Sequence, residues 1–187
     1  IHNELFNILD GFNSPEEIIA ARGARNYIMA PFANRIKDGL YNFNNSVHQL
    51  KPVPPRSQVI HGFAAFQEFN LKDVFNNSNY ILIEFESQPI SSSQYSGYPF
   101  DIQIRVAYKL FDKKIEITVS GINNGKEPAP FWSGWHPYFK TNKKGIENLI
   151  LTIPAEKIIL VDREFIPLEG EAAFGDIEKY PNKNFSL

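Results

Sequence analysis

Two histidines lie in sequence surroundings that suit acid–base chemistry. His136 falls within FWSGWHPYF, residues 131–139, where two Trp, two Phe and one Tyr surround a single imidazole. His61 falls in VIHGF, directly before a glycine that lets the backbone take a positive φ or approach another segment closely. Imidazole titrates at about pH 6.5, so it can exchange protons near neutral pH, and aromatic neighbours exclude water and orient it. The alternative is a structural role: a packed core ring at His136 and a backbone-bonded ring at a strand start at His61.

An amide and a guanidinium stand together at Asn34 and Arg35, within PFANRIKDG. The planar guanidinium suits the hydroxyl groups of a polyol, and its alternative role is a surface ion pair. His48 alternates with Val47 and Gln49 and is predicted to be a partly exposed strand residue. The histidine pair has no third ligand at a metal-binding spacing such as HExxH, so no metal site is predicted.

The elements that must position these residues are predicted to be strands. Residues 101–110, DIQIRVAYKL, alternate apolar and polar side chains, and residues 114–122, KIEITVSGI, repeat the pattern. The intervening FDKK suits a tight turn, so the two predict a β-hairpin. Further strands are predicted over residues 64–71, 79–86, 149–153 and 157–161. Many strands at short spacing predict an all-β fold, a large antiparallel β-sandwich.

Signals for helices and for domain boundaries are weak. Ser14 followed by Pro15 suits the start of one brief helix, and residues 52–55 and 91–97 are predicted loops. Neither loop is long enough to link domains, so residues 1–187 are predicted to form a single β-sandwich domain, truncated at both ends. The chain starts without Met or a signal-peptide pattern and ends without a closing helix or polar tail, so we expect a fragment of a longer protein.

Composition argues against several classes of partner. The 187 residues are 43% hydrophobic and 14% aromatic, enough for a sizeable core. A net charge of −2 without a basic stretch argues against nucleic acid and membrane surfaces, and no apolar run reaches the ~20 residues that span a bilayer. Glycine-rich nucleotide motifs and the GxSxG of serine hydrolases are missing. The lack of cysteine permits a reducing compartment, so we expect a cytoplasmic protein, with a periplasmic one as the alternative.

Taken together, the motifs resemble the aldose 1-epimerase (galactose mutarotase) family from about Pro31 to about Gly170. The resemblance rests on the order and spacing of four stretches: PFANRIKDGLY, VIHGF, YPFDIQIRVAYKL and GWHPYF. The stretch VDREFIPLEG resembles a later family strand, but Leu168-Glu169-Gly170 departs from the turn that usually follows it. The resemblance implies a large antiparallel β-sandwich that interconverts the α and β anomers of free aldoses. Its substrate would be a small-molecule sugar, and it needs no cofactor.

The resemblance also implies roles for individual residues. His136 would protonate the ring oxygen of the sugar, and His61 would hydrogen-bond near that oxygen. The substrate-binding residues would be the pair that meets the sugar hydroxyls and two aromatic residues of the pocket: Asn34, Arg35, Tyr138 and Trp135. The general-base glutamate and a sugar-binding aspartate of the family would follow Leu187. Three acidic residues near the end of the chain match neither motif: Glu169, Glu171 and Asp176.

Three functions therefore stay open from the sequence. The first is an aldose 1-epimerase acting on a free aldohexose by acid–base ring opening and reclosure. The second is a related enzyme for a hexose 6-phosphate, which would need a cationic cluster built from Arg35 with Arg56 or Arg105. The third is a catalytically inactive, carbohydrate-binding β-sandwich. The preferred sugar and the oligomeric state are not specified by these patterns.

Overall fold

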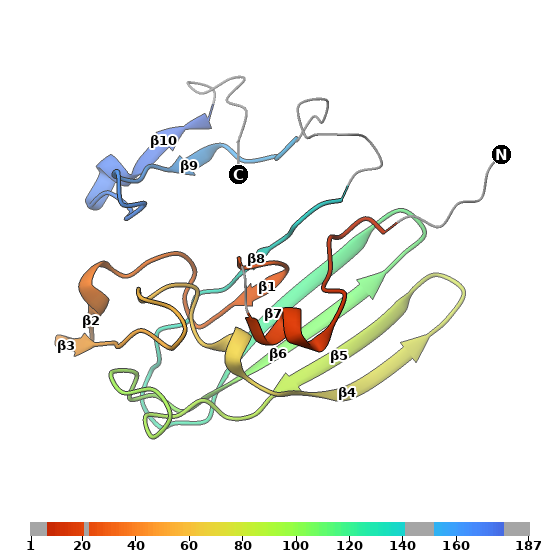
Figure 1. The fold of residues 1–187 in the computed structure, drawn as a ribbon, viewed down its shortest axis with the longest axis horizontal. Coiled ribbons are helices and arrows are strands. Elements are labelled where there is room, and N and C mark those ends of the chain that lie inside the picture. The colour runs from red at the N-terminus through yellow and green to blue at the C-terminus, as the bar shows by residue number, and fades with distance from the viewer. Residues whose placement is uncertain (1–6, 21–22, 141–151, 178–187) are drawn as a thin grey trace. The chain divides into compact units, whose positions relative to one another are not determined.

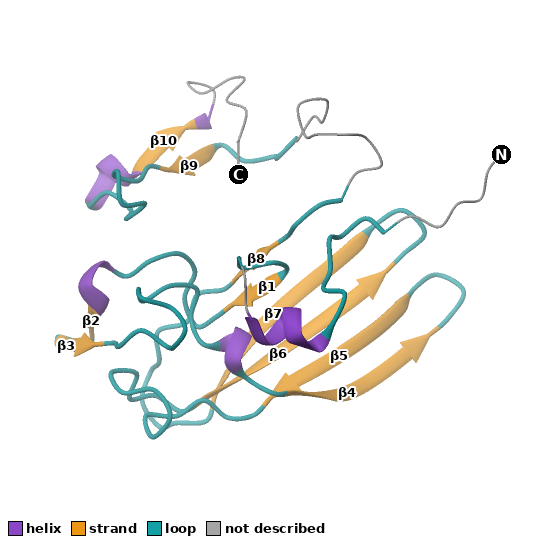
Figure 2. Cartoon of the chain, in the orientation of Figure 1, coloured by secondary structure: helices purple, strands orange, loops and turns teal. Residues whose placement is uncertain are grey.

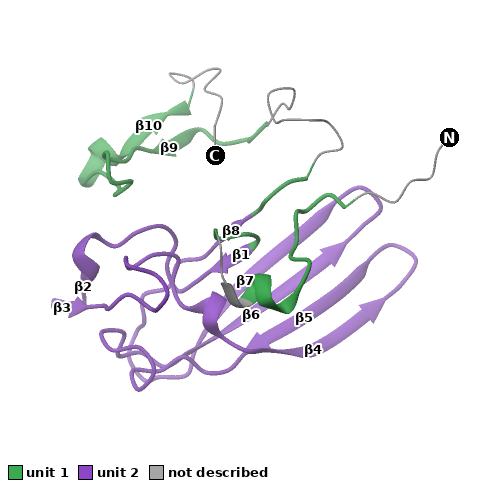
Figure 3. Ribbon diagram, in the orientation of Figure 1, with its two compact units in different colours: residues 1–26, 137–187 green, residues 27–136 purple. Residues whose placement is uncertain are grey.

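The computed structural model describes residues 7–20, 23–140 and 152–177. This described part of the chain is mostly strand and loop, with one α-helix of six residues and three short 3-10 helices (Figure 2). The predicted all-β class is therefore confirmed. The chain divides into two compact units, residues 27–136 and residues 1–26 with 137–187 (Figure 3). A single domain over residues 1–187 stays a prediction.

A four-stranded antiparallel sheet dominates the unit of residues 27–136. Its long strands run side by side in the order β4-β5-β6-β7 (Figure 1). The strands are β4 Phe69–Asn76, β5 Ile81–Ser87, β6 Ile102–Leu110 and β7 Ile115–Asn123. The sequence predicted β5, β6 and β7 to within two residues at each end. The predicted β6–β7 hairpin is confirmed, and the Phe111 amide closes its turn by donating to the Lys114 carbonyl.

One face of this sheet carries the core, because side chains alternate across a strand. Ile104 and Val106 on β6 are 0% and 2% exposed, whereas Arg105 between them lies on the opposite face and is only half-buried. The register sets Val106 opposite Phe85 of β5 and Val119 of β7, so apolar side chains from three strands meet on that face. Burying each such side chain stabilises the fold by about 1.5–3 kcal/mol.

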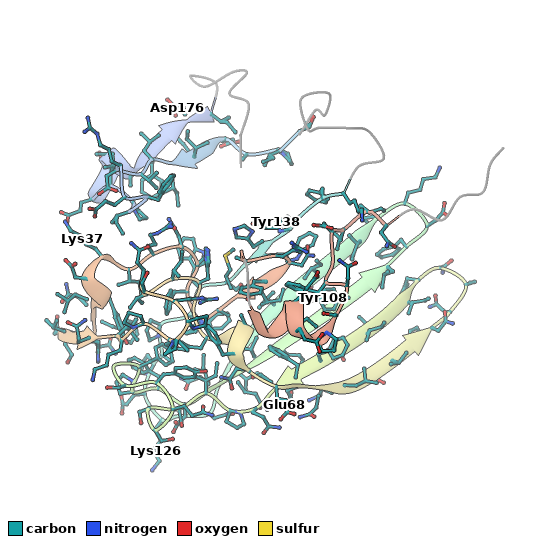
Figure 4. The ribbon with its side chains drawn as sticks, in the orientation of Figure 1. Lys37, Glu68, Tyr108, Lys126, Tyr138 and Asp176 are labelled. Carbon is teal, nitrogen blue, oxygen red and sulfur yellow. The ribbon has the colours of Figure 1, made fainter. Side chains whose placement is uncertain are left out.

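The same apolar face continues into solvent at its far end. Tyr108 of β6, labelled in Figure 4, is half-buried and lies on this face two residues beyond Val106. Toward the β6–β7 turn and on the edge strand β4, side chains that share the face by strand register are between 40% and 59% exposed: Leu71, Val74, Ile81, Leu110 and Ile115. The hydrophobic face of the sheet is thus larger than the core that covers it.

The segment before the sheet corrects one prediction. Residues 64–71 were predicted as a strand, but Ala64–Phe66 form the 3-10 helix η2 and β4 begins only at Phe69. The amides of Phe63 and Ala64 both donate to the Ala30 carbonyl, which turns the chain out of the extended conformation at this point. The rest of β4 escaped prediction because a register shift between Leu71 and Asp73 interrupts its alternation.

Four short strands of three or four residues each complete the unit, and the sequence indicated only the one around His48 through its alternation. β1 (Tyr27–Met29) pairs antiparallel with β8 (Gly134–His136), joining the two ends of the unit. The hairpin of β2 (Leu40–Phe43) and β3 (Ser46–Gln49) follows the 3-10 helix η1 (Lys37–Gly39). Asn44 and Asn45 form its two-residue turn with φ of +48° and +60°, values that Asn tolerates better than most residues.

Two loop segments of this unit are bound to each other through their backbones. Ala30 forms a parallel bridge with Gly62, and Arg35 forms an antiparallel bridge with Ile60. The Ile36 amide also donates to the Val59 carbonyl at 3.1 Å. Residues 30–36 and 59–64 therefore form one assembly, although more than twenty residues of chain separate them.

The other unit, residues 1–26 with 137–187, holds short elements. The helix α1 (Pro15–Ala20) begins where Ser14 and Pro15 predicted it. Close by, the Asp10 amide donates to the Tyr138 carbonyl at 2.8 Å, and the Lys140 amide donates to the Ile8 carbonyl at 2.7 Å. None of the helices in the part of the chain that the structure describes is long and apolar enough to cross a membrane.

Late in the chain, β9 (Lys157–Ile159) pairs antiparallel with β10 (Phe174–Asp176), next to the 3-10 helix η3 (Gly170–Ala173). The predicted strand over residues 157–161 is thus confirmed for its first three residues. Of the predicted strand 149–153, residues 149–151 lie outside the described residues. Residues 152 and 153 form no strand.

We expect Gly62→Ala to destabilise the fold by about 3 kcal/mol. Gly62 has φ of +62°, and a Cβ there would lie 2.1 Å from the Ala30 carbonyl oxygen, which is fixed backbone. Urea unfolding followed by circular dichroism measures the loss. The control is Gly125→Ala, where a Cβ would come no closer than 3.3 Å, to the Asn123 side chain. Equal, small losses in both variants would contradict the close packing of residues 30–36 on residues 59–64.

Candidate functional site

His61 lies in a backbone turn that ordinary residues avoid. Its φ is +60° and that of the following Gly62 is +62°, so two successive residues take the left-handed conformation. The turn is held on one side by the Ala30 carbonyl, which accepts the Phe63 amide at 2.7 Å and the Ala64 amide at 3.0 Å. This conformation directs the His61 ring, and it follows from the glycine that the sequence places directly after the histidine.

Asn34 and Arg35 are bound directly to the His61 turn. The Asn34 carbonyl accepts the His61 amide at 3.0 Å, and Arg35 is bridged to Ile60. The Arg35 side chain donates through Nε to Gln58 Oε1 at 2.9 Å and through Nη1 to Asn34 Oδ1 at 3.4 Å. Three of the residues that the sequence singled out thus belong to one backbone assembly, and Gln58 orients the guanidinium plane.

His136 reaches the same place from the other end of the unit. On β8 it pairs with Tyr27, and its neighbour Trp135 pairs with Ile28. The rings of His61 and His136 have centroids 5.4 Å apart and an interplanar angle of 77°, an edge-to-face contact. The structure therefore brings together the two imidazoles that lie 75 positions apart in the sequence (136 minus 61).

The environment of His61 favours an uncharged ring. Burial lowers the pKa of His61 from 6.5 to about 4, and His136, Arg56 and Arg35 add to the lowering. Each of these effects disfavours a positive charge on the ring, burial through desolvation and the three neighbours through repulsion. The His61 Nδ1 atom is also buried and has no hydrogen-bond partner among the described residues. A neutral ring with a buried, unpaired nitrogen is suited to meet a polar atom of a ligand.

Of the two predicted aromatic residues, Trp135 borders a hollow in the unit of residues 27–136. This hollow has a volume of about 380 Å³ and is lined by β7 and the chain around β8: Ile115, Ile117, Val119, Ser133, Gly134 and Trp135. Neither His61 nor His136 belongs to its lining, so the hollow and the histidine pair are separate features of this unit. Its walls are mostly apolar.

Tyr138, the other predicted aromatic residue, belongs to the unit of residues 1–26 with 137–187 (Figure 4). Its amide donates to Asn26 Oδ1 at 3.1 Å, and its ring lies next to Gly23, where a Cβ would come within 3.1 Å of the hydroxyl oxygen. These contacts lie within its own unit. A place for Tyr138 in a sugar pocket stays a prediction.

Several residues that the sequence set aside have contacts or exposure of their own. His48 on β3 is half-buried and stacks on Tyr41 at 4.9 Å, which confirms it as a partly exposed strand residue. Glu169 and Glu171 are exposed, and Asp176 forms an ion pair with Lys157. Within residues 7–20, 23–140 and 152–177, no cluster of three His, Cys, Asp or Glu side chains could hold a metal ion.

Sequence reasoning missed Gln58 altogether and considered Arg56 only for a phosphate-binding cluster, not as a support of the His61 turn. Gln58 binds the Arg35 guanidinium, and Arg56 lies beside the His61 turn with its Nη1 donating to the carbonyls of Ile60 and Gly62. Neither residue belongs to a recognisable motif. Their closeness to His61 along the chain was the one signal that could have found them.

Comparisons with known proteins identify the family of this chain. A family model described as aldose 1-epimerase matches residues 2–180. The uncharacterized protein YihR of Escherichia coli (strain K12) is 28% identical over 158 residues, which cover 83% of this chain and 48% of YihR. The uncharacterized protein YphB of the same strain is 28% identical over 120 residues, covering 64% of this chain and 38% of YphB. The chain thus spans about half, or less, of the length of these curated relatives.

Solved structures show the same fold. The galactose 1-epimerase from Lactobacillus acidophilus NCFM superposes with a TM-score of 0.68 at 20% identity, covering 91% of this chain and 49% of that one. A GalM/aldose epimerase homologue from C. elegans gives a TM-score of 0.68 at 18% identity, covering 91% and 50%. These likenesses confirm the predicted β-sandwich of the galactose mutarotase type. Because the family model matches nearly the whole sequence, this chain belongs to the aldose 1-epimerase family.

Proposed function

We propose that this chain carries the acid side of the active site of an aldose 1-epimerase that interconverts the α and β anomers of a free aldohexose. The observation that carries the proposal is the edge-to-face contact of His61 and His136 beside the backbone-linked pair Asn34 and Arg35. Family membership supports the reaction class. The sugar and the activity of the whole protein are part of the proposal.

The proposed chemistry needs two proton transfers and no cofactor. A base removes the proton of the anomeric hydroxyl while an acid protonates the ring oxygen, so the C1–O5 bond breaks and an open-chain aldehyde forms. Rotation about C1–C2 presents the other face of the aldehyde. The ring hydroxyl then attacks that face, its proton returns to the acid, and the base returns its proton to the new anomeric oxygen. We assign the acid role to His136.

His61 is proposed to hydrogen-bond near the ring oxygen rather than to carry the proton. Its pKa of about 4 makes it uncharged at neutral pH, so it does not repel a protonated His136. Its buried Nδ1, which lacks a partner among the described residues, would gain one in the sugar complex. Two rings held at a fixed angle would thus divide the work of proton donation and orientation.

Asn34 and Arg35 are proposed to bind the hydroxyl groups of the sugar. A guanidinium offers five N–H donors in one plane, and the contact of Nε with Gln58 holds that plane in one orientation. Trp135 is proposed to offer apolar surface to the C–H face of the sugar. We propose that the general base is a glutamate outside the described residues. The exposed Glu169 and Glu171 and the ion-paired Asp176 are not assigned to it.

A free aldose is favoured over a phosphorylated one. A phosphate needs several converging cationic donors. Arg56 instead donates to backbone carbonyls and packs on aromatic rings, and Arg105 is paired with Glu86 on the polar face of the sheet. Of the three arginines considered from the sequence, Arg35 is the one bound through neutral side-chain oxygens, those of Gln58 and Asn34, so one guanidinium and not a cluster is left to meet a ligand.

We expect His136→Gln to lower the mutarotation rate by about 10²–10⁴-fold, as for loss of a general acid, with little change in sugar binding. Polarimetry on freshly dissolved α-glucose and α-galactose measures the rate, and saturation-transfer NMR measures binding. His48→Gln, which changes a histidine of the β2–β3 hairpin, is the control. An unchanged rate in His136→Gln would remove this residue from the mechanism. Sugar binding without mutarotation by the wild type would favour the inactive, carbohydrate-binding alternative.

Arg35→Ala is expected to weaken sugar binding by about 10-fold or more, because a buried hydroxyl that loses a charged donor is left unpaired. The KM from polarimetric progress curves reports the loss. Arg105→Ala removes a guanidinium that is paired with Glu86 on the sheet, so it is the matched control. If Arg35→Ala unfolds the protein instead, the guanidinium has the structural role that the sequence left as an alternative.

The neutral His61 also predicts a pH dependence of stability. Its folded-state pKa of about 4 lies below the ordinary value of 6.5, so the unfolded chain binds more protons between these values. This contribution is fully present above pH 6.5 and is lost as the pH falls toward 4. We expect a loss of about 2 kcal/mol after discounting for solvent screening of a half-buried ring.

Urea unfolding at pH 7 and at pH 4.5 measures this pH dependence. His61→Gln removes the titrating group and should show a smaller difference between the two pH values than the wild type does. His48→Gln should keep the wild-type difference. The same difference in wild type and His61→Gln would refute a neutral, buried His61.

A further inference from the structure

Arg56 occupies a place that neither the family motifs nor the proposed reaction accounts for. It follows the loop of residues 52–55, and its own amide donates to the Val53 carbonyl at 3.0 Å. Its Nη1 atom donates to two backbone carbonyls, those of Ile60 and of Gly62, the second at 3.2 Å. These carbonyls flank His61 on both sides, so one guanidinium nitrogen closes the turn that presents the imidazole.

The guanidinium also packs against aromatic rings on two sides. Its central carbon lies 4.5 Å from the centroid of the Phe66 ring and 5.6 Å from that of Tyr27. Phe66 belongs to η2, directly after the His61 turn, whereas Tyr27 is the β1 residue that pairs with His136. Arg56 therefore contacts the element that presents each histidine. Cation–π contacts of a half-buried arginine add to the directionality of its hydrogen bonds.

The His61 turn needs such a support because its backbone is strained. A non-glycine residue at φ of +60° costs about 1 kcal/mol or more relative to the ordinary regions. With His61 and Gly62 both left-handed, the carbonyls of Ile60 and Gly62 converge on the same side, where each needs a donor. The Ala30 carbonyl fixes the turn from one side through the Phe63 and Ala64 amides, and Arg56 supplies the donors on the other.

We propose that Arg56 is a positioning residue of the reaction, whose guanidinium holds the His61 turn and thereby fixes the His61 ring in its edge-to-face contact with His136. This inference rests on the proposed function of the histidine pair. A lysine can supply the charge and donate to the two carbonyls, but it lacks the planar guanidinium that packs on the rings of Phe66 and Tyr27 while one of its nitrogens donates to both carbonyls. The planar guanidinium, and not only the charge, is therefore what the position requires.

The charge of Arg56 has a second effect on His61. The groups that face the His61 ring are His136, Arg56 and Arg35, and all three oppose a positive charge on it. Burial is the largest cause of the lowered His61 pKa, so removing Arg56 should raise that pKa without restoring it to 6.5. A guanidinium that stabilised the fold from a place away from the His61 ring would leave the His61 titration of the folded protein unchanged.

The test uses Arg56→Met and Arg56→Lys, with Arg105→Met as the control for loss of a guanidinium elsewhere in the unit. Histidine side chains labelled with ¹⁵N report the His61 titration by NMR, and polarimetry reports kcat and KM for α-galactose. For Arg56→Met we expect a raised His61 pKa and a fall in kcat of about 10–100-fold with little change in KM, because a misplaced reacting group slows the chemical step. For Arg56→Lys we expect a His61 pKa near that of the wild type but a reduced kcat. Arg105→Met should match the wild type in both measurements.

An unchanged His61 titration and an unchanged kcat in folded Arg56→Met would overturn the proposal. If Arg56→Met does not fold, Arg56→Lys provides the test. A wild-type kcat in Arg56→Lys would show that the planar guanidinium is not required and would overturn the proposal. The NMR titration does not depend on turnover. A wild-type protein without mutarotation therefore refutes the proposed function, while a raised His61 pKa in Arg56→Met still supports the contact of Arg56 with the His61 turn.

Discussion

The site depends on one backbone constraint, the close approach of the Ala30 carbonyl to Gly62. A side chain at position 62 would occupy the space of that carbonyl, so only glycine permits the two segments to lie this near. Once they do, two successive amides after Gly62 find the same acceptor, and the amide of His61 finds the Asn34 carbonyl. The imidazole and the neighbouring Asn-Arg pair thus become parts of one rigid backbone arrangement, and their relative positions do not depend on side-chain contacts alone.

Around this constraint the site gathers cations rather than separating them. Two guanidiniums and a second imidazole lie around His61, and each of them opposes a positive charge on its ring. Such a cluster is unfavourable if every member is charged, and the lowered pKa of the half-buried His61 keeps that ring neutral. The guanidiniums are turned toward oxygen acceptors, Gln58 and Asn34 for Arg35 and backbone carbonyls for Arg56. A neutral His61 beside His136 is what the proposed division of roles between the two histidines needs.

The long strands could be predicted from the sequence, whereas much of the site could not. β6 and β7 alternate apolar and polar residues without interruption, so their period of two can be recognised in the sequence. In β4 a register shift interrupts the alternation, and β1 and β8 are too short to show a period. The two histidines were brought together through the family resemblance of their motifs. The residues around each histidine do not by themselves predict a contact between residues 61 and 136. The support that Arg56 gives to the His61 turn was not predicted, because its partners are main-chain carbonyls and no residue type in the sequence indicates such a contact.

The sheet face described above has a consequence for the behaviour of the protein in solution. Its core region excludes water, but near the β6–β7 turn and on the edge strand β4 five large aliphatic side chains are exposed to solvent. Exposed apolar side chains on one face favour association over hydration, and the net charge of −2 of these 187 residues offers weak mutual repulsion. Self-association of this chain is therefore expected to increase with its concentration.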